Sequence, residues 1–304
     1  MGDTIPSLLK HAAKIAAAHR VTRGGKFRLK DHDPENTGGL PPDSEEAAKD
    51  AIREAVDRIA ALQERLYAEN KTGVVILLQA MDAAGKDGVV KHVMSGVNPQ
   101  GCVVTSFKQP SSDEANHDFL WRCSKALPAR GMIGIFNRSY YEETLVVRVH
   151  PGLLAGEHLK DKTIGDGFWK HRFKSIRHFE DHLVAGGYVV LKFFLNVSKE
   201  QQQRRLLRRL DDPERHWKFS AADVVERGFW DDYRHAYDQT IRHTATKTAP
   251  WYVVPADHKW YTRYVVTAAI LDALETLAPK FPTLSAAEKR KLGEARRKLM
   301  SENG

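Results

Sequence analysis

The chain has 304 residues, of which 42% are hydrophobic and 28% charged, so it can bury a large core and need not divide into two domains. Its net charge of +8 favours a polyanionic partner, whether nucleic acid, an anionic membrane or a phosphate polymer. Two cysteines exclude a disulfide scaffold or a cysteine-based zinc site, and no apolar run approaches the ~20 residues of a membrane span. We therefore expect a soluble, cytoplasmic protein without a secretory signal and without membrane binding.

Residues 1–42 are predicted to form a basic N-terminal arm and loop. The arm contains a basic amphipathic helix over 8–20, and turn-forming residues dominate 30–42. Asp43 and Glu46 have the spacing of a capping box, which predicts the start of a long helix that continues over 47–67.

The segment 43–280 is predicted to be one α/β domain. Its apolar runs predict strands over 74–80, 102–107, 132–137, 188–197 and 251–254. Helical periods fill the intervals over 87–94, 113–127, 141–149, 169–185, 200–210 and 221–244. This alternation predicts a parallel sheet covered by helices on both faces, with ligands bound beyond the carboxyl ends of its strands. Residues 281–304 should form a charged C-terminal helix that opens with a Ser285/Glu288 capping box.

A phosphate-binding loop is predicted directly after the first of these strands, in the run Asp82-Ala83-Ala84-Gly85-Lys86-Asp87-Gly88. In such loops the backbone N–H groups of a tight turn face an anion, and a lysine adds a positive charge. Ala80 replaces the first glycine of the P-loop consensus, and Asp87 stands where Ser or Thr would hold magnesium. An ordinary strand-to-helix turn with a surface lysine stays open for this segment taken alone.

Asp82 lies inside the predicted loop, where its carboxylate would repel a phosphate unless a cation stands between them. A magnesium ion resolves this repulsion. Asp82 is therefore a candidate metal ligand, a candidate base toward the acceptor phosphate, or both in turn.

A second polar group follows the strand over 132–136. Asn137 stands where nucleotide-handling folds place a metal-binding acid, and Glu142 is a nearby acid that could supply the missing charge. A guanidinium beside a transferred phosphoryl group stabilises the charge on its oxygens, so Arg138 is a candidate catalytic residue. The alternative is a strand end whose polar residues lie in solvent.

The helix over 200–210 is rich in arginine. The i,i+4 spacing puts Arg205 and Arg209 on one face and Arg204 and Arg208 on the next. Such stacked charges indicate either a solvated basic face or a lid that closes over phosphates and extends to Lys218. Lys108, at the end of another strand, has the position of a phosphate contact or of an ordinary surface lysine.

Several motifs in the same order resemble the polyphosphate kinase 2 family over about residues 20–280. They are Asp82–Gly88, Ser106–Pro110, His117–Arg122, Phe136–Ser139, Leu210–Pro213, His216–Ser220 and Pro250–Ala256. The form of three of them is most similar to class III, whose members phosphorylate both AMP and ADP. Many relatives have Asp at the position of Asn137.

The resemblance implies a P-loop kinase-like fold, an inorganic polyphosphate donor, a magnesium or manganese requirement, and assembly as a homodimer or homotetramer. It also implies a helical lid, here over about 198–230, and gives Asp82 and Lys86 to the Walker A-like loop and Arg138 to the Walker B-like segment. Nucleotide or phosphate binding is expected of Ala83, Ala84, Gly85, Asp87, Gly88 and Asn137. Polyphosphate contacts are expected of Lys108, Arg122, Arg205, Arg209 and Lys218.

Residues and resemblance together predict transfer of the terminal phosphoryl of polyphosphate to AMP and ADP, with no specific nucleic-acid partner. The acceptor phosphates would lie on the loop at Gly85 and Lys86, with metal ions held by Asp82 and Glu142. Phosphoryl transfer needs positioning and charge neutralisation more than covalent chemistry. An ATP-dependent nucleotide or nucleoside kinase and a non-catalytic polyanion-binding protein remain the alternatives.

Overall fold

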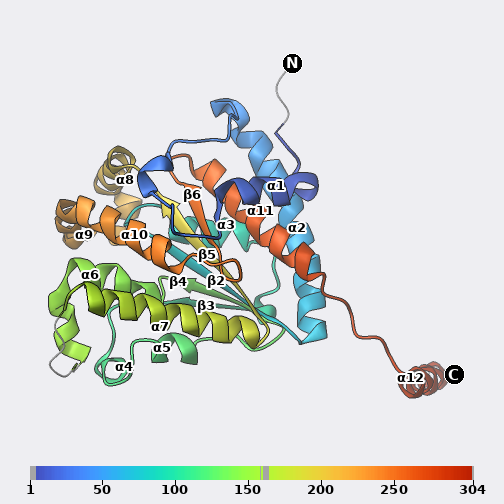
Figure 1. Cartoon of the computed structure of the whole chain (residues 1–304). Coiled ribbons are helices and arrows are strands. Elements are labelled where there is room, and N and C mark those ends of the chain that lie inside the picture. The colour runs from blue at the N-terminus through green and yellow to red at the C-terminus, as the bar shows by residue number, and fades with distance from the viewer. Residues whose placement is uncertain (1–4, 158, 160–163, 303–304) are drawn as a thin grey trace.

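A six-stranded sheet lies between two layers of helices (Figure 1). The computed structural model describes residues 5–157, 159 and 164–302. The strands are β1 Arg20–Val21, β2 Gly73–Ala80, β3 Cys102–Ser106, β4 Ile133–Asn137, β5 Tyr188–Asn196 and β6 Trp251–Pro255. Their order across the sheet is β1-β6-β5-β2-β4-β3, and every pairing is parallel except that of β1 with β6. The three-layer α/β prediction is confirmed.

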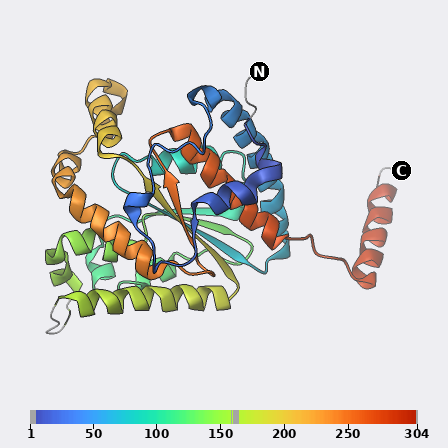
Figure 2. The same cartoon turned by 45° about the horizontal axis from the view of Figure 1, so that its top comes forward.

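The helices divide between the two faces of the sheet. One layer contains α1 Leu8–His19, α2 Glu45–Glu69, α3 Lys86–Val93 and α11 Lys259–Leu277. The other contains α7 Asp166–Ala185 and α10 Trp230–Thr244, with the short α4 Ser112–Ala115, α5 Trp121–Lys125 and α6 Val146–Val149. Both α8 Lys199–Asp211 and α9 Ala221–Glu226 lie at the end of the sheet where β5 ends (Figures 1 and 2).

The middle of the sheet is the most deeply buried part of the core. β2 runs between β4 and β5, and all eight of its residues are buried. A parallel strand covered on both faces is apolar at consecutive positions, which explains the run Val74–Leu78. Because β2, β4 and β5 end at one edge, the segments that follow them meet there.

The N-terminal segment is part of this core. α1 packs on α11, and Leu8, Ala12 and Ala16 are buried in the same apolar cluster as the sheet. β1 adds an antiparallel edge strand that the sequence analysis did not predict. The amphipathic helix expected in the basic N-terminal arm is present as α1, and its apolar face lies on α11.

Three predicted helices are interrupted in the structure. The segment 113–127 forms α4 and α5 separately, because the Asp118 side chain accepts a hydrogen bond from the Leu120 N–H and so favours a turn. The segment 141–149 begins as a 3₁₀ helix over Tyr140–Thr144, and 221–244 is broken by another over Arg227–Phe229. The predicted cap at Asp43 is wrong as well, because a 3₁₀ turn over Pro42–Ser44 precedes α2.

α11 was missed because its sequence lacks an amphipathic period. Twelve of its residues are buried, on nearly all sides of the helix, so no polar stripe marks it. In contrast, α12 Ala286–Ser301 has the predicted Ser285/Glu288 capping box, has no buried residue, and stands away from the rest of the molecule (Figure 2). No helix in the described ranges is both long and apolar enough to cross a membrane.

Candidate active site

The loop between β2 and α3, which we call the cradle loop (residues 81–88), has the backbone of a tight phosphate-binding turn. Ala83 and Gly85 adopt left-handed conformations with φ of 60° and 114°. A Cβ added at Gly85 would meet no atom within 4 Å, so this position needs glycine for its conformation and not for space. α3 begins at Lys86, and the free N–H groups of its first turn provide an anion site next to that turn.

Lys86 is held over the cradle loop by one hydrogen bond. Its Nζ donates to the Ala80 carbonyl oxygen over 2.7 Å, while part of the side chain stays exposed to the pocket. Burial and the nearby Arg138 lower the pKa of Lys86 to about 8, against the opposing effect of three carboxylates. Among the described residues no carboxylate forms an ion pair with this ammonium group, and an anion in the pocket would raise its pKa again.

Arg138 joins the two acids that were predicted to hold metal. Its guanidinium donates to Asp82 Oδ1 and to Glu142 Oε2, each over 3.0 Å. Burial lowers the pKa of Arg138, but Glu142 and Asp82 outweigh this and keep it above its ordinary value. The backbone of Arg138 is left-handed with φ of 66°, a conformation that costs about 1–3 kcal/mol in a residue other than glycine.

Asn137 faces α3. Its Nδ2 donates to Asp87 Oδ1 over 2.9 Å, so these two predicted phosphate-binding residues are paired with each other at the rim of the pocket. The parallel pairing of β4 with β2 sets this geometry, because Asn137 lies opposite Leu78 in the register.

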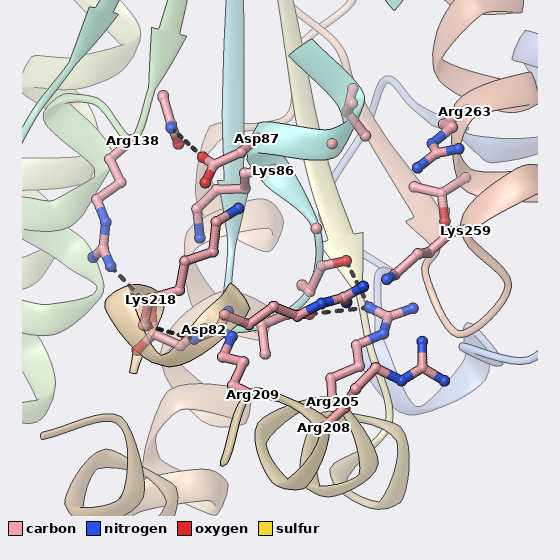
Figure 3. Close-up of a pocket in the computed structure, with 18 residues that line it drawn as sticks. Asp82, Lys86, Asp87, Arg138, Arg205, Arg208, Arg209, Lys218, Lys259 and Arg263 are labelled. Atoms are coloured by element: carbon pink, nitrogen blue, oxygen red, sulfur yellow. Dashed lines mark hydrogen bonds and ion pairs between the residues drawn. The ribbon is translucent and has the colours of Figure 1, made fainter. Parts of the chain in front are cut away.

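A strongly basic pocket of about 390 Å³, which we call the cradle pocket, opens above the cradle loop (Figure 3). Among the described residues, nine cationic side chains line it, against the two acids Asp82 and Asp87. The nine are Lys86, Arg138, Arg205, Arg208, Arg209, Arg215, Lys218, Lys259 and Arg263. So many like charges repel one another unless a polyanion lies among them.

The predicted lid arginines have different environments. Arg205 is 8% exposed, and its guanidinium donates to the carbonyl oxygens of Ala83, Ala84, Ala256 and Asp257. Burial lowers its pKa to about 10. Arg205 therefore ties α8 to the cradle loop, and its carbonyl partners leave it less free for a phosphate than the sequence analysis expected.

Arg209 and Lys218 lie farther along the lid. Arg209 donates to Asp223 of α9 over 2.8 Å, and the Lys218 ammonium lies 4.9 Å from the centre of the Trp217 ring. Ser198 caps the lid helix α8, since its side chain accepts a hydrogen bond from the Gln201 N–H. The Gln201 side chain does not complete a capping box, because its amide donates to the Asp257 carbonyl.

Lys108 and Arg122 are not in the cradle pocket. They line a second pocket of about 550 Å³, in which Arg122 donates to the Lys108 carbonyl oxygen over 2.8 Å. This second pocket has apolar walls that include Phe107 and Phe119. Arg138 lines both pockets and so lies at the point where they meet.

Four cationic residues of the cradle pocket were not predicted as site residues from the sequence. Lys259 and Arg263 come from α11, which carries no helical period. Arg208 was predicted only to lie on a basic helix face, and Arg215 was not singled out. The i,i+4 spacing of Lys259 and Arg263 directly after the last strand is the signal that could have found them.

The donor set suits a hard cation only in part. Within the described ranges, no group of three or more His, Cys, Asp or Glu side chains could hold a metal ion. Asp82 and Glu142 are brought together by Arg138. Magnesium commonly takes one or two carboxylates and fills its other positions with water and substrate phosphates, so these two acids fit it.

Comparisons with known proteins indicate one family. A family model described as Polyphosphate kinase 2 matches residues 43–282. The chain is 46% identical over 282 residues to an ADP-polyphosphate phosphotransferase of Rhodopseudomonas palustris, covering 90% of this chain and 98% of that protein. It is 42% identical over 272 residues to an AMP/ADP-polyphosphate phosphotransferase of Meiothermus ruber, with coverage of 90% and 97%.

A solved structure is similar over nearly the whole chain. The crystal structure of polyphosphate kinase 2 from Arthrobacter aurescens superposes with a TM-score of 0.83 at 40% identity, covering 92% of this chain and 96% of that one. Together with the cradle loop and the arginine-rich lid, these matches show that the chain belongs to the polyphosphate kinase 2 family.

Proposed function

We propose that this protein transfers the terminal phosphoryl group of inorganic polyphosphate to AMP and to ADP. The observation that carries the proposal is the position of Arg138, between a pocket rich in cations and a pocket with apolar walls. Polyphosphate suits the first pocket because it offers a negative charge at every repeat and nothing apolar. A nucleoside suits the second.

The donor end of the site is the cradle pocket. Lys86 and the first turn of α3 would hold the reacting end of the polyphosphate, with the lid cations beyond them. This arrangement revises the expectation that the acceptor phosphates lie on the cradle loop. The revision follows from the nine cations of this pocket, which match a long polyanion better than a single nucleotide.

The acceptor end is the second pocket, where Phe107, Phe119 and His117 offer surface for a nucleoside base. The names of two relatives, an ADP-polyphosphate and an AMP/ADP-polyphosphate phosphotransferase, support adenine nucleotides as acceptors. The acceptor's terminal phosphate would then point toward Arg138, which lines both pockets.

In the transfer, an oxygen of the acceptor's terminal phosphate bonds to the terminal phosphorus of the donor. The bond from that phosphorus to its bridging oxygen breaks, and the shortened polyphosphate leaves with the negative charge. Arg138 and Lys86 would stabilise the charge on the moving phosphoryl group, and Asp82 would keep Arg138 oriented.

Magnesium is the metal that we propose for this site, with Asp82 and Glu142 as its protein ligands. When bound, it would neutralise phosphate charge between donor and acceptor. Because both carboxylates contact Arg138, the guanidinium would have to give up at least one of these contacts to the metal.

We propose further that the protein acts in the cytoplasm as a homodimer or homotetramer and has no specific nucleic-acid partner. The free thiols of Cys102 and Cys123 are compatible with a reducing compartment. The proposal of an oligomer rests on the family resemblance. Light scattering of the purified protein tests it.

The deciding experiment mixes the protein with magnesium, long-chain polyphosphate and AMP, and follows nucleotides by chromatography. ADP should form first and ATP later. Supplying ATP as the only donor tests the ATP-dependent alternative, which predicts transfer without polyphosphate. Polyphosphate binding without any transfer would instead indicate a polyanion-binding protein.

A further inference from the structure

The cradle pocket continues past the cradle loop to the start of α11. Lys259 and Arg263, one helical turn apart on α11, line it together with Arg208 of α8. A Cβ added at Gly88 would lie 3.7 Å from an Arg263 guanidinium nitrogen, so Arg263 lies beside the first turn of α3. Figure 3 shows Arg138 and Arg263 on opposite sides of the cradle loop.

Direct ion pairs among the described residues do not explain these cations, although the Glu45 carboxylate at the start of α2 acts on Arg263. Within the described ranges, Lys259, Arg263 and Arg208 form no ion pair, whereas Arg209 pairs with Asp223 and Arg215 with Asp212. The charged groups that act on Lys259 are Arg205, Arg208, Arg263 and Arg215, all of them positive. A solvated basic surface would gain nothing from gathering its charges in one pocket, since they repel one another.

The two ends of the pocket have different surroundings. The end at Arg138 meets the second pocket, and Arg138 there pairs with Asp82 of the cradle pocket and with Glu142 of the second pocket, so transfer belongs at this end. The end at α11 contains cations and Thr262. Arg205, between the two ends, is already bonded to four carbonyl oxygens.

We infer that the start of α11 is a distal subsite for the polyphosphate donor, at which Lys259 and Arg263 bind phosphates far from the reacting end and so favour long chains over short ones. The inference rests on the proposed function. A short donor that fills the reacting end does not reach these cations, whereas a long chain binds both ends at once and gains from multivalency.

The test is the double variant Lys259→Gln/Arg263→Gln, assayed with ADP and with either long-chain polyphosphate or short oligophosphates of a few units as donor. We expect KM for the long chain to rise about ten-fold or more, as two charge-assisted contacts are lost. KM for the short donor should change less than about two-fold, and kcat at saturation should stay within a few-fold. KM for ADP should not change.

A matched control exists on α7, where Lys170 and Lys174 have the same spacing and are exposed on the other side of the sheet. Lys170→Gln/Lys174→Gln removes the same charge and should leave the preference for long chains intact. The exchange Lys259→Arg/Arg263→Lys keeps both charges and should keep most of that preference. Thermal unfolding of each variant checks that it is folded.

Two results would overturn the inference: an unchanged preference for long chains in Lys259→Gln/Arg263→Gln, or an equal rise in KM for both donors, which would place α11 at the reacting end. If the wild-type protein transfers no phosphoryl group from polyphosphate, the proposed function fails. Direct binding of long-chain polyphosphate without nucleotide then still tests the subsite. Loss of affinity in Lys259→Gln/Arg263→Gln but not in Lys170→Gln/Lys174→Gln supports it, and an affinity of Lys259→Gln/Arg263→Gln equal to that of the wild type refutes it.

Discussion

Two lysines in different parts of the same fold show how a buried cation serves structure in one place and ligand binding in the other. Lys192, in the middle of β5, is fully buried, and its Nζ donates to Glu180 Oε2, to the Thr244 carbonyl and to the Tyr141 hydroxyl. Lys86, at the start of α3, has one hydrogen bond within the described part of the chain, to the Ala80 carbonyl, and otherwise faces the cradle pocket.

The difference lies in how many of the three ammonium donors are satisfied by the protein. Burial lowers the pKa of both lysines, but in Lys192 the carboxylate of Glu180 opposes this at a distance of 2.6 Å. The protein therefore completes the environment of Lys192 and leaves that of Lys86 to be completed by a ligand.

The two lysines are connected through the segment that follows β4. Tyr140 and Tyr141 both donate to Glu180 Oε1, and they lie between Arg138 and Glu142 in the chain. The ion pair of Lys192 with Glu180, which we call the buried pair, therefore anchors the backbone next to Arg138 through these two tyrosines. A left-handed residue other than glycine needs such anchoring, because its conformation is strained.

The largest effect is expected from breaking the buried pair. Lys192→Ala should lower the free energy of unfolding by about 3–5 kcal/mol, because Glu180 would keep a charge in the core without its partner. Urea unfolding measures this. Lys192→Met with Glu180→Leu removes both charges and should recover much of the stability; if the single and double variants are equally unstable, packing and not charge explains the loss.

Removing the Lys86 side chain should lower turnover and leave the free energy of unfolding nearly unchanged. Lys86→Ala is expected to lower kcat by at least ~10²-fold, the scale of one lost electrostatic contact to a transition state. Its urea midpoint should stay close to that of the wild type. Lys91→Ala, an exposed lysine on the same helix, is the control; turnover of Lys86→Ala within a few-fold of this control would remove the cradle loop from the mechanism.

The comparison also separates what the sequence could and could not predict. The cradle loop was found because strand, glycine and lysine are adjacent in the chain, and its signal is local. The partners of Lys192 were not found, because Glu180, Thr244 and Tyr141 come from three other segments. Spacing placed Arg205 on a lid, and only the tertiary structure shows that its guanidinium is bonded to backbone carbonyls.

The same reasoning explains the missed half of the pocket. Lys259 and Arg263 follow β6, and their helix is buried on nearly all sides, so neither a polar stripe nor a motif marks them. They reach the site because β6 lies beside β5 in the sheet, and this pairing depends on the whole topology.

A smaller effect should appear as pH dependence of donor binding. Lys259 is exposed to the pocket, yet burial among its neighbours and the charges of Arg205 and Arg208 lower its pKa to about 8. As the pH rises through this value, Lys259 loses its proton and its positive charge. We therefore expect KM for long-chain polyphosphate to rise several-fold, up to about ten-fold, between about pH 7 and about pH 9.

Lys86 titrates in the same range, so the wild-type profile alone does not identify the group. In Lys259→Arg the side chain stays charged throughout, and KM should vary less with pH than in the wild type, whereas any change in kcat from Lys86 should persist. Identical KM profiles for the two proteins would show that Lys259 does not contribute.

The smallest effect is expected at Asn137 and Asp87. Like Lys192, these side chains have a hydrogen-bond partner within the protein, and like Lys86 they lie at the cradle pocket. Asn137→Asp would replace the amide donor of this 2.9 Å hydrogen bond with a second carboxylate, so two negative charges would face each other beside the phosphates. We expect the wild type to accept both AMP and ADP. Asn137→Asp should lower the ratio of kcat/KM for AMP to kcat/KM for ADP by a few-fold, which narrows the range of acceptors.

The exchange Asn137→Asp/Asp87→Asn distinguishes charge from position. It restores one carboxylate and one amide, and with them the hydrogen bond, but moves the negative charge from α3 to the end of β4. If the added charge causes the narrowing, the exchange should recover the wild-type ratio; if a carboxylate at the end of β4 causes it, the ratio should stay low. A time course from AMP under excess polyphosphate and magnesium measures both steps, and wild-type ADP that accumulates without later ATP would refute the expected acceptor range.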